Sequence, residues 1–345
     1  MFKLNPYKNN PILKPMGEGF ESLCVLNPAV IYDDKNEEFV MLYRAASKND
    51  IMHHIYLGLA KSKDGFNFQR QSDKPVLSPT LDGEDAGCVE DPRLVKIGDW
   101  YYITYASRPY APGRYWLDEP KPWFNPPEEG PCFLKYNNSI TYLAITQDFY
   151  NYKKLGRITK TTEDDRDVFI FPEQVNGKWV RFSRPLYNYK DYGLKVPGIL
   201  IAYSSDLMEW ENPVKFCDPL YEFESAKMGG STPPLKTKDG WLFLYHGVSA
   251  KDNMYRVGAM LLDLNNPSKI LCRTENPILE PVKEEGSIYS GCVFPTGNVI
   301  KDGILYVYYG INDHEIGVAT CEVEELLDYL KKECRVWKKS YPSYF

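Results

Sequence analysis

The chain of 345 residues has only four histidines, no closely paired cysteines and no long hydrophobic run. Its eight cysteines are scattered without a Cys-x-x-Cys pair, which argues against a zinc pattern and a compact disulfide framework. No window approaches 18 apolar residues, so we expect no transmembrane helix. The first six residues contain no apolar signal core, and we therefore expect a cytoplasmic protein. A net charge of −6 without a basic run argues against nucleic acid as a partner.

Aromatic residues, proline and glycine are abundant instead. The sequence has 27 Tyr, 16 Phe and 7 Trp, together 14 % of its residues, with 26 Pro and 24 Gly. This composition favours an all-β protein in which many short strands are joined by tight turns. Aromatic rings also pack well against the apolar faces of sugar rings, so a carbohydrate partner is consistent with it.

An internal repeat is the strongest structural signal. Each unit begins with a proline, continues through an apolar pair and a polar turn, and ends in an aromatic strand. The prolines at positions 28, 92, 172, 234 and 295 are separated by 64, 80, 62 and 61 residues. Asn-Gly or Asp-Gly dipeptides at 176–177, 239–240 and 302–303 mark hairpin turns. Five near-equal units of about four strands predict a five-bladed β-propeller, one domain over 1–345, whereas a two-sheet sandwich does not account for five units.

Three segments lie outside the repeat. The long second spacing contains an insertion, roughly 108–136, that is rich in Pro, Gly and aromatic residues. The segment 10–15 (Asn-Pro-Ile-Leu-Lys-Pro) matches 276–281 (Asn-Pro-Ile-Leu-Glu-Pro), so we expect the N-terminal segment to complete the last blade and protect its edge. The pattern over 323–332 predicts a short C-terminal helix.

The most charged of the repeat starts is Glu90-Asp-Pro-Arg93, at the entrance to a strand. The inner strand of each propeller blade begins beside the central axis, so the residues that precede the repeated prolines are expected to converge there. These residues are Asn27, Asp91, Phe171, Pro233 and Phe294. Because Asp91 is the one acid among them, we interpret it as a candidate proton donor to a departing glycosidic oxygen.

The ends of the predicted hairpins supply Arg44, Arg184 and His246, and the strand that follows the fourth hairpin supplies Tyr255. Arginine holds phosphate through a two-pronged donor geometry, so a pocket with these groups suits a polyol together with an anion. Taken singly, each arginine is equally well a surface ion pair and His246 a buried structural residue. Their equivalent positions in the repeat are what favour a common site.

Several motifs occur in one order along the chain: Asn27-Pro-Ala-Val-Ile-Tyr32, Glu90-Asp-Pro-Arg93, Asp167-Val-Phe-Ile-Phe-Pro-Glu173, Tyr245-His-Gly-Val248 and Tyr308-Tyr-Gly310. From residue 10 to about residue 322 the sequence resembles glycoside hydrolase family 130, the β-mannoside phosphorylases and β-mannosidases. The resemblance implies a five-bladed propeller independently of the repeat.

The resemblance also implies roles for individual residues. Asp91 would be the general acid, acting through a sugar hydroxyl. The mannosyl unit would be held by Asn27, Arg44, Glu90, Arg93 and Asp313. The phosphate site would consist of Arg166, Arg184, His246 and Tyr255. No metal and no cofactor are implied, and inorganic phosphate would be the co-substrate of a β-mannoside oligosaccharide.

The sequence departs from the family pattern at the phosphate end, with Ser183-Arg-Pro185 in place of His-Arg-Pro and Arg166 in place of a lysine. We expect an inverting β-mannoside phosphorylase that releases mannose 1-phosphate. A β-mannosidase on the same scaffold is the alternative, and it would need a carboxylate base such as Glu173, Glu222 or Glu224. A sugar-binding propeller without turnover and an arabinan- or fructan-type hydrolase with acids on separate blades are further alternatives. The insertion could cap its own pocket or dock on a second subunit of a homo-oligomer.

Overall fold

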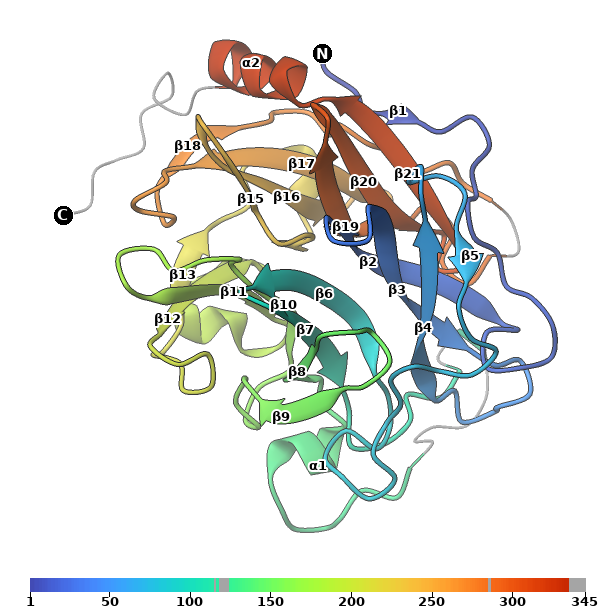
Figure 1. Cartoon of the computed structure of the whole chain (residues 1–345). Coiled ribbons are helices and arrows are strands. Elements are labelled where there is room, and N and C mark those ends of the chain that lie inside the picture. The colour runs from blue at the N-terminus through green and yellow to red at the C-terminus, as the bar shows by residue number, and fades with distance from the viewer. Residues whose placement is uncertain (115, 118–123, 285–286, 335–345) are drawn as a thin grey trace.

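A computed structural model describes residues 1–114, 116–117, 124–284 and 287–334, and its five antiparallel sheets are arranged around a central axis (Figure 1). The prediction of an all-β five-bladed propeller with a short C-terminal helix is confirmed. Blade one contains β2 (Cys24–Asp33), β3 (Glu38–Ala46), β4 (Ile55–Ser62) and β5 (Gln69–Arg70). Blade two contains β6 (Glu90–Ile97), β7 (Trp100–Ser107), β8 (Ile140–Thr146) and β9 (Lys153–Arg157).

The other three blades follow the same order from the inner strand outward. Blade three contains β10 (Asp165–Ile170), β11 (Trp179–Pro185), β12 (Ile199–Ser204) and β13 (Val214–Cys217). In blade four the inner strand is split into β14 (Lys227–Gly230) and β15 (Leu235–Thr237), and β16 (Gly240–Val248), β17 (Tyr255–Leu262) and β18 (Ile270–Arg273) follow. Blade five contains β19 (Val293–Lys301), β20 (Ile304–Ile311) and β21 (Glu315–Glu322), with β1 (Asn5–Pro6) at its edge.

The N-terminal segment lies along the last blade. Asn5 is paired with Thr320 in the β1–β21 ladder, and Leu13 forms a separate bridge to Ile316. Between them the Asn10 side chain donates to the carbonyl oxygen of Val318, at 2.9 Å. The contact therefore extends over 5–13, and it covers backbone groups of β21 that would otherwise form an open edge.

The helices are short. The predicted C-terminal helix is α2 (Val323–Glu333), whose buried side chains pack on blades four and five. The insertion contains a helix that the sequence analysis did not predict, α1 (Cys132–Tyr136), whereas residues 115 and 118–123 of it lie outside the described part of the chain. Two short 3₁₀ helices are η1 (Asn188–Tyr192) and η2 (Glu222–Glu224). Among the described residues, no helix has the length and apolar character needed to cross a bilayer.

Most of the core consists of apolar clusters that join two neighbouring blades. Between blades three and four, for example, Phe169 and Phe182 pack on Phe243, with ring centroids 5.7 and 5.1 Å away, and all three are fully buried. Burying one large apolar side chain contributes roughly 1.5–3 kcal/mol, so each joint is well stabilised. The blades are thereby held as a rigid mount for the residues at the axis.

A bulge occurs at the start of the inner strand in blades one, two and three. The pairing register shifts between Leu26 and Ala29, between Glu90 and Arg93, and between Arg166 and Phe169. Asn27, Asp91 and Asp167 lie at these bulges with φ of 46°, 51° and 55°. Asn and Asp adopt left-handed backbone more readily than other side chains, and a bulge redirects the side chain out of the pleat.

These registers correct the alignment of the third repeat. The residue equivalent to Asn27 and Asp91 is Asp167, and the expectation that Phe171 occupies this position is wrong. Phe171 is fully buried between blades three and four, packed on Phe182 and Trp241. Pro172 follows the end of β10 and has no part in the bulge.

Candidate active site

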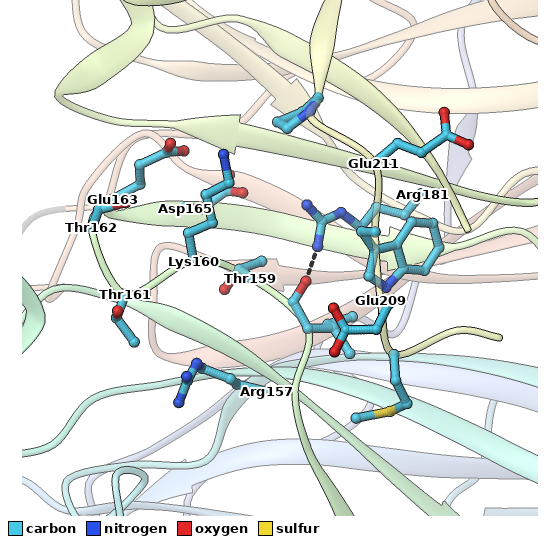
Figure 2. Close-up of a pocket in the computed structure, with 14 residues that line it drawn as sticks. Arg157, Thr159, Lys160, Thr161, Thr162, Glu163, Asp165, Arg181, Glu209 and Glu211 are labelled. Atoms are coloured by element: carbon cyan, nitrogen blue, oxygen red, sulfur yellow. Dashed lines mark hydrogen bonds between the residues drawn. The ribbon is translucent and has the colours of Figure 1, made fainter. Parts of the chain in front are cut away.

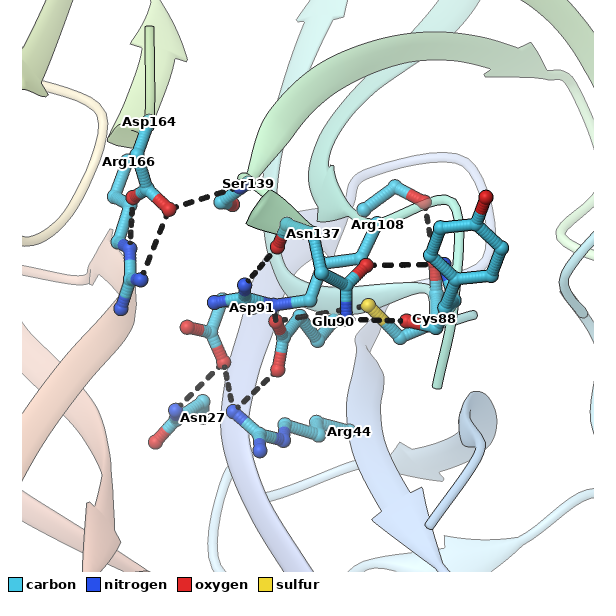
Figure 3. Close-up of polar contacts among 12 residues, drawn as sticks. Asn27, Arg44, Cys88, Glu90, Asp91, Arg108, Asn137, Ser139, Asp164 and Arg166 are labelled. Atoms are coloured by element: carbon cyan, nitrogen blue, oxygen red, sulfur yellow. Dashed lines mark hydrogen bonds and ion pairs between the residues drawn. The ribbon is translucent and has the colours of Figure 1, made fainter. Parts of the chain in front are cut away.

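Asp91 lies at the centre of a polar cluster contributed by blades one and two (Figure 3). Its Oδ1 accepts hydrogen bonds from Asn27 Nδ2 at 2.8 Å and from Arg44 Nη1 at 2.9 Å. The same Arg44 nitrogen lies 2.9 Å from Glu90 Oε2. Burial raises the pKa of Asp91, but the charges of Arg44 and Arg93 outweigh it and leave the pKa below its usual value.

Arg93 links this cluster to a second one around Asp167. Its Nη1 donates to the backbone carbonyl of Asp91 at 2.8 Å and its Nε to that of Ser231 at 3.0 Å. Its third nitrogen, Nη2, lies 3.7 Å from Asp167 Oδ1, and the guanidinium carbon lies 5.5 Å from the centre of the Phe294 ring. Arg93 is almost completely buried, so these contacts fix its position.

Asp167 organises the second cluster. Its Oδ2 accepts a hydrogen bond from Arg184 Nε at 2.6 Å and lies 3.5 Å from His246 Nε2. Burial raises the pKa of Asp167, yet Arg184, His246 and Arg93 hold the net value well below the usual range, so the group is ionised. A Cβ on Gly229 would come within 2.2 Å of Asp167 Oδ2, which is why a glycine occupies that position. Asp167 belongs to one of the motifs that resemble the family, but it was not among the predicted site residues.

Lys227, at the start of β14, is a second residue that sequence reasoning missed. Its ammonium group lies 4.8 Å from the centre of the Tyr255 ring. Burial and, next, the charge of Arg184 lower the pKa of Lys227 to about 8, with a smaller contribution from Arg166. Lys227 lies two residues before Gly229 in β14, which pairs with β16. Knowledge of the pairing register of blade four would have identified it as a site residue.

Three of the four predicted phosphate residues, Arg184, His246 and Tyr255, lie together beside Asp167 and Lys227. The ring centroids of His246 and Tyr255 are 5.7 Å apart. The fourth, Arg166, pairs with Asp164 at 2.5 Å and is about one-third exposed, at the edge of the group. Burial lowers the pKa of His246 to about 3 despite the attraction of Asp167, so its imidazole is neutral near pH 7.

Several buried nitrogen atoms of this region have no hydrogen-bond partner among the described residues. They are Arg93 Nη2, Arg184 Nη1 and His246 Nε2. Buried polar groups in folded proteins are nearly always hydrogen-bonded, so unpartnered nitrogens grouped around one charge indicate a ligand site. Because the surrounding side chains are mainly positively charged, we expect the ligand to be an anion.

Asp313 approaches Asp91 from blade five, in left-handed backbone with φ of 54°. Burial raises its pKa to about 6, and the charge of Asp91 acts in the same direction while Arg44 opposes it. Acids from three blades, Asp91, Asp167 and Asp313, therefore approach the axis, as an arabinan- or fructan-type hydrolase would require. Asp167, however, is committed to two arginines and a histidine and is not a free third carboxylate.

The three glutamates considered as bases for hydrolysis lie elsewhere in structural contacts. Glu173 is half-exposed beyond β10 and forms an ion pair with Lys236. Glu222 accepts a hydrogen bond from Ser249 at 2.5 Å and is also exposed. Glu224 is completely buried and pairs with Arg273 Nη2 at 2.5 Å and Tyr245 at 2.6 Å. Within the described part of the chain, the hydrogen bonds and ion pairs of these glutamates are all with residues outside the Asp91 cluster.

Replacing Glu224 with glutamine is expected to destabilise the protein by about 3–5 kcal/mol, because the fully buried charge of Arg273 loses its counter-charge. The midpoint of thermal unfolding should fall by roughly 5 °C or more. Glu173→Gln is the matched control, since its ion pair is exposed and should contribute less than about 1 kcal/mol. Equal midpoints for the two variants would contradict this role of Glu224.

A polar cavity of about 460 Å³ lies beside blade three (Figure 2), and Asp91 is not among the residues that line it. Arg181 lines it, donating to the carbonyl oxygen of Ile158, and its guanidinium lies 5.0 Å from the centre of the Trp210 ring. These contacts join the outer parts of blades two and three, and none of the predicted site residues lines this cavity. We therefore place the candidate active site at the axis.

Fold and site together define a class: β-propeller enzymes that act on glycosidic bonds, with carboxylic acids beside a group of cations at the axis. Among the described residues, no three His, Cys, Asp or Glu side chains are grouped to hold a metal ion. A family profile described as β-1,4-mannooligosaccharide phosphorylase matches residues 9–122 and 132–332. The chain belongs to this family, glycoside hydrolase family 130, as the motif resemblance predicted.

Similar proteins agree with this assignment. A 1,2-β-oligomannan phosphorylase of Thermoanaerobacter sp. (strain X514) is 37 % identical, over 94 % of this chain and 99 % of the relative. A β-1,2-mannobiose phosphorylase of the same organism is 36 % identical with the same coverage. The solved structure of β-1,2-mannobiose phosphorylase from Listeria innocua, in complex with β-1,2-mannobiose, superposes with a TM-score of 0.75 at 26 % identity, covering 96 % of this chain and 99 % of that one.

Proposed function

We propose that this protein is an inverting β-mannoside phosphorylase in which Asp91 is the proton donor and the cations around Asp167 bind phosphate. One observation carries the proposal. Unpartnered buried nitrogens and the ammonium group of Lys227 form an anion site immediately beside the Asp91 cluster. Hydrolysis would require a carboxylate base at that place, and the glutamates considered for it are committed to other contacts.

In the proposed reaction a phosphate oxygen attacks C1 of the terminal mannosyl unit from the face opposite the departing sugar. The C1–O bond to the acceptor breaks, and its oxygen receives the proton of Asp91 through a sugar hydroxyl. Inversion converts the β-mannoside into α-mannose 1-phosphate and a chain one unit shorter. Asn27, Arg44, Glu90, Arg93 and Asp313 hold the mannosyl unit.

The protonation state of Asp91 depends on phosphate in this scheme. In the free protein Arg44 and Arg93 keep the Asp91 pKa low, which disfavours the protonated form that a donor needs. A bound phosphate dianion offsets the charge of Arg93 and its neighbours, and the Asp91 pKa rises accordingly. Proton donation and phosphate binding are thereby coupled.

The β-1,2 linkage is the one we favour. The relatives at 31–37 % identity are all named for β-1,2-linked mannosides, whereas a β-1,4-mannooligosaccharide phosphorylase of Ruminococcus albus is 28 % identical. We also propose that the whole chain is one catalytic domain. A cytoplasmic location follows from the product, because a sugar phosphate is of use only inside a cell.

A panel of β-1,2-, β-1,3- and β-1,4-mannobiose, each incubated with phosphate, tests linkage and stereochemistry together. We expect α-mannose 1-phosphate from the β-1,2 substrate, with its anomeric configuration assigned by NMR from the one-bond coupling between C1 and H1. Release of the β-anomer, or equal rates on all linkages, would contradict the proposal.

The KM for phosphate is expected to rise as the pH increases through about 8. Lys227 carries a positive charge below its pKa and loses it above, so the attraction for phosphate is present at neutral pH and lost in alkali. Initial rates between pH 6.5 and 9.5 at several phosphate concentrations provide the measurement. A Lys227→Met variant should lack this inflection, and a wild-type KM that stays constant up to pH 9.5 would exclude Lys227 from the phosphate site.

A further inference from the structure

A cavity of about 530 Å³ lies where the insertion meets blade three. It is lined by Cys132, Tyr136, Asn138, Thr162, Tyr187 and Asn188. Tyr136 ends helix α1 and is 70 % exposed, and Tyr187 precedes η1 and is 66 % exposed. Two solvent-facing aromatic rings beside two amide side chains offer stacking surfaces together with hydrogen-bond donors and acceptors, which is the chemistry that recognises a sugar.

Two chains of contacts connect this cavity to the candidate active site, one to Glu90 beside Asp91 and the other to Arg166. In the first, Arg108 lies between Glu90 and the insertion: its Nε is 3.7 Å from Glu90 Oε1, and its Nη1 donates to the carbonyl oxygen of Asn137 at 2.5 Å (Figure 3). Asn137 stands between the cavity residues Tyr136 and Asn138. The wall of the cavity therefore begins two side chains away from the catalytic carboxylate cluster.

The second chain passes through Asp164. Its carboxylate accepts a hydrogen bond from the backbone N–H of Ser139 at 3.0 Å and pairs with Arg166 (Figure 3). Its carbonyl accepts from the N–H of Leu186 at 2.9 Å, next to Tyr187. These hydrogen bonds hold segments 137–139, 162–164 and 186–188 together. The cavity that they form lies next to Arg166, at the edge of the predicted phosphate-binding residues.

We infer that Tyr136 and Tyr187 form a distal acceptor subsite, which binds mannosyl units beyond the one that receives the leaving-group proton. The inference rests on the proposed function, because it deepens that function to longer β-mannooligosaccharides as the preferred substrates. In this arrangement a disaccharide fills only the two positions that flank the broken bond. Units three and four contact the tyrosines, and their binding contributes to kcat/KM.

Phosphorolysis of β-1,2-mannobiose and β-1,2-mannotetraose by the wild type, Tyr136→Ala and Tyr187→Ala tests the inference. The wild type should be more efficient on the tetraose. Each substitution should lower kcat/KM for the tetraose about tenfold and leave the value for mannobiose within about twofold. Tyr136→Phe and Tyr187→Phe should retain most of the tetraose efficiency, because they keep the ring.

Tyr150→Ala is the matched control, since Tyr150 is an exposed tyrosine at the outer turn of blade two. A loss that is equal for both substrates, or no loss for either, would overturn the distal subsite while leaving the phosphorylase proposal intact. Should the wild type prove inactive on every mannoside, the proposed function fails instead. Calorimetric binding of mannotetraose to the wild type and the two alanine variants then still decides the subsite, because it requires no turnover, and equal affinities would overturn it.

Discussion

Asp91→Asn is expected to lower kcat for phosphorolysis by about a thousandfold or more, with folding and mannoside binding retained. Asparagine keeps the shape and the contacts with Asn27 and Arg44 but cannot release a proton, and general acid catalysis typically contributes 10²–10⁴-fold. The measurement is single-turnover kinetics with β-1,2-mannobiose at saturating phosphate. A sugar-binding propeller without turnover would show equal binding for both proteins and no phosphorolysis in either.

Asp313→Asn is the matched comparison, because Asp313 is a second aspartate whose charge interacts with Asp91 and Arg44, and its pKa is raised to about 6. We expect this variant mainly to raise the KM for the mannoside, with kcat reduced far less than in Asp91→Asn. A raised pKa is itself a property of proton donors. A kcat loss that is greater for Asp313→Asn would therefore exchange the two roles.

Lys227→Met is expected to raise the KM for phosphate by roughly 10–100-fold and to leave the KM for the mannoside nearly unchanged. A hydrogen bond to a charged group contributes about 1.5–3 kcal/mol, and methionine removes the charge while keeping most of the length of the side chain. Lys227 forms no ion pair with a described carboxylate, so its loss leaves no buried charge unpartnered. Arg184 is a less suitable target, since its removal would also deprive the buried Asp167 carboxylate of its hydrogen-bonded counter-charge.

Lys236→Met is the control for this effect. Lys236 belongs to the same blade but is half-exposed and paired with Glu173, outside the axis. Its substitution should change neither KM. If the KM for phosphate in Lys227→Met stays within threefold of the wild-type value, the cation group beside Asp167 is not where phosphate binds.

The sequence predicted the architecture because each blade repeats the same local events. Asp-Gly turns at 239–240 and 302–303 and the aromatic strands that follow them are independent of distant contacts, and both hairpins are present. The same reliance on local pattern misaligned the third repeat in the sequence. Pro172 resembles the start of a unit, but the bulge that defines the start lies at Asp167, where the next residue is Val168 instead of proline.

The site divides in a similar way. Asn27, Asp91 and Arg44 were predictable, because each occupies an equivalent position of the repeat. Lys227 was not, since the inner strand of blade four is broken into β14 and β15 and its register is visible only in three dimensions. The neutral state of His246 could not be predicted either, because it results from complete burial among residues distant in sequence.

The most direct test of the account compares β-1,2-mannobiose breakdown with and without inorganic phosphate, with both mannose 1-phosphate and free mannose quantified. A phosphorylase gives one mannose 1-phosphate and one mannose for each bond cleaved, and we expect no cleavage when phosphate is omitted. Free mannose released at an equal rate in both reactions, two for each bond and without the sugar phosphate, would contradict it and identify the protein as a hydrolase.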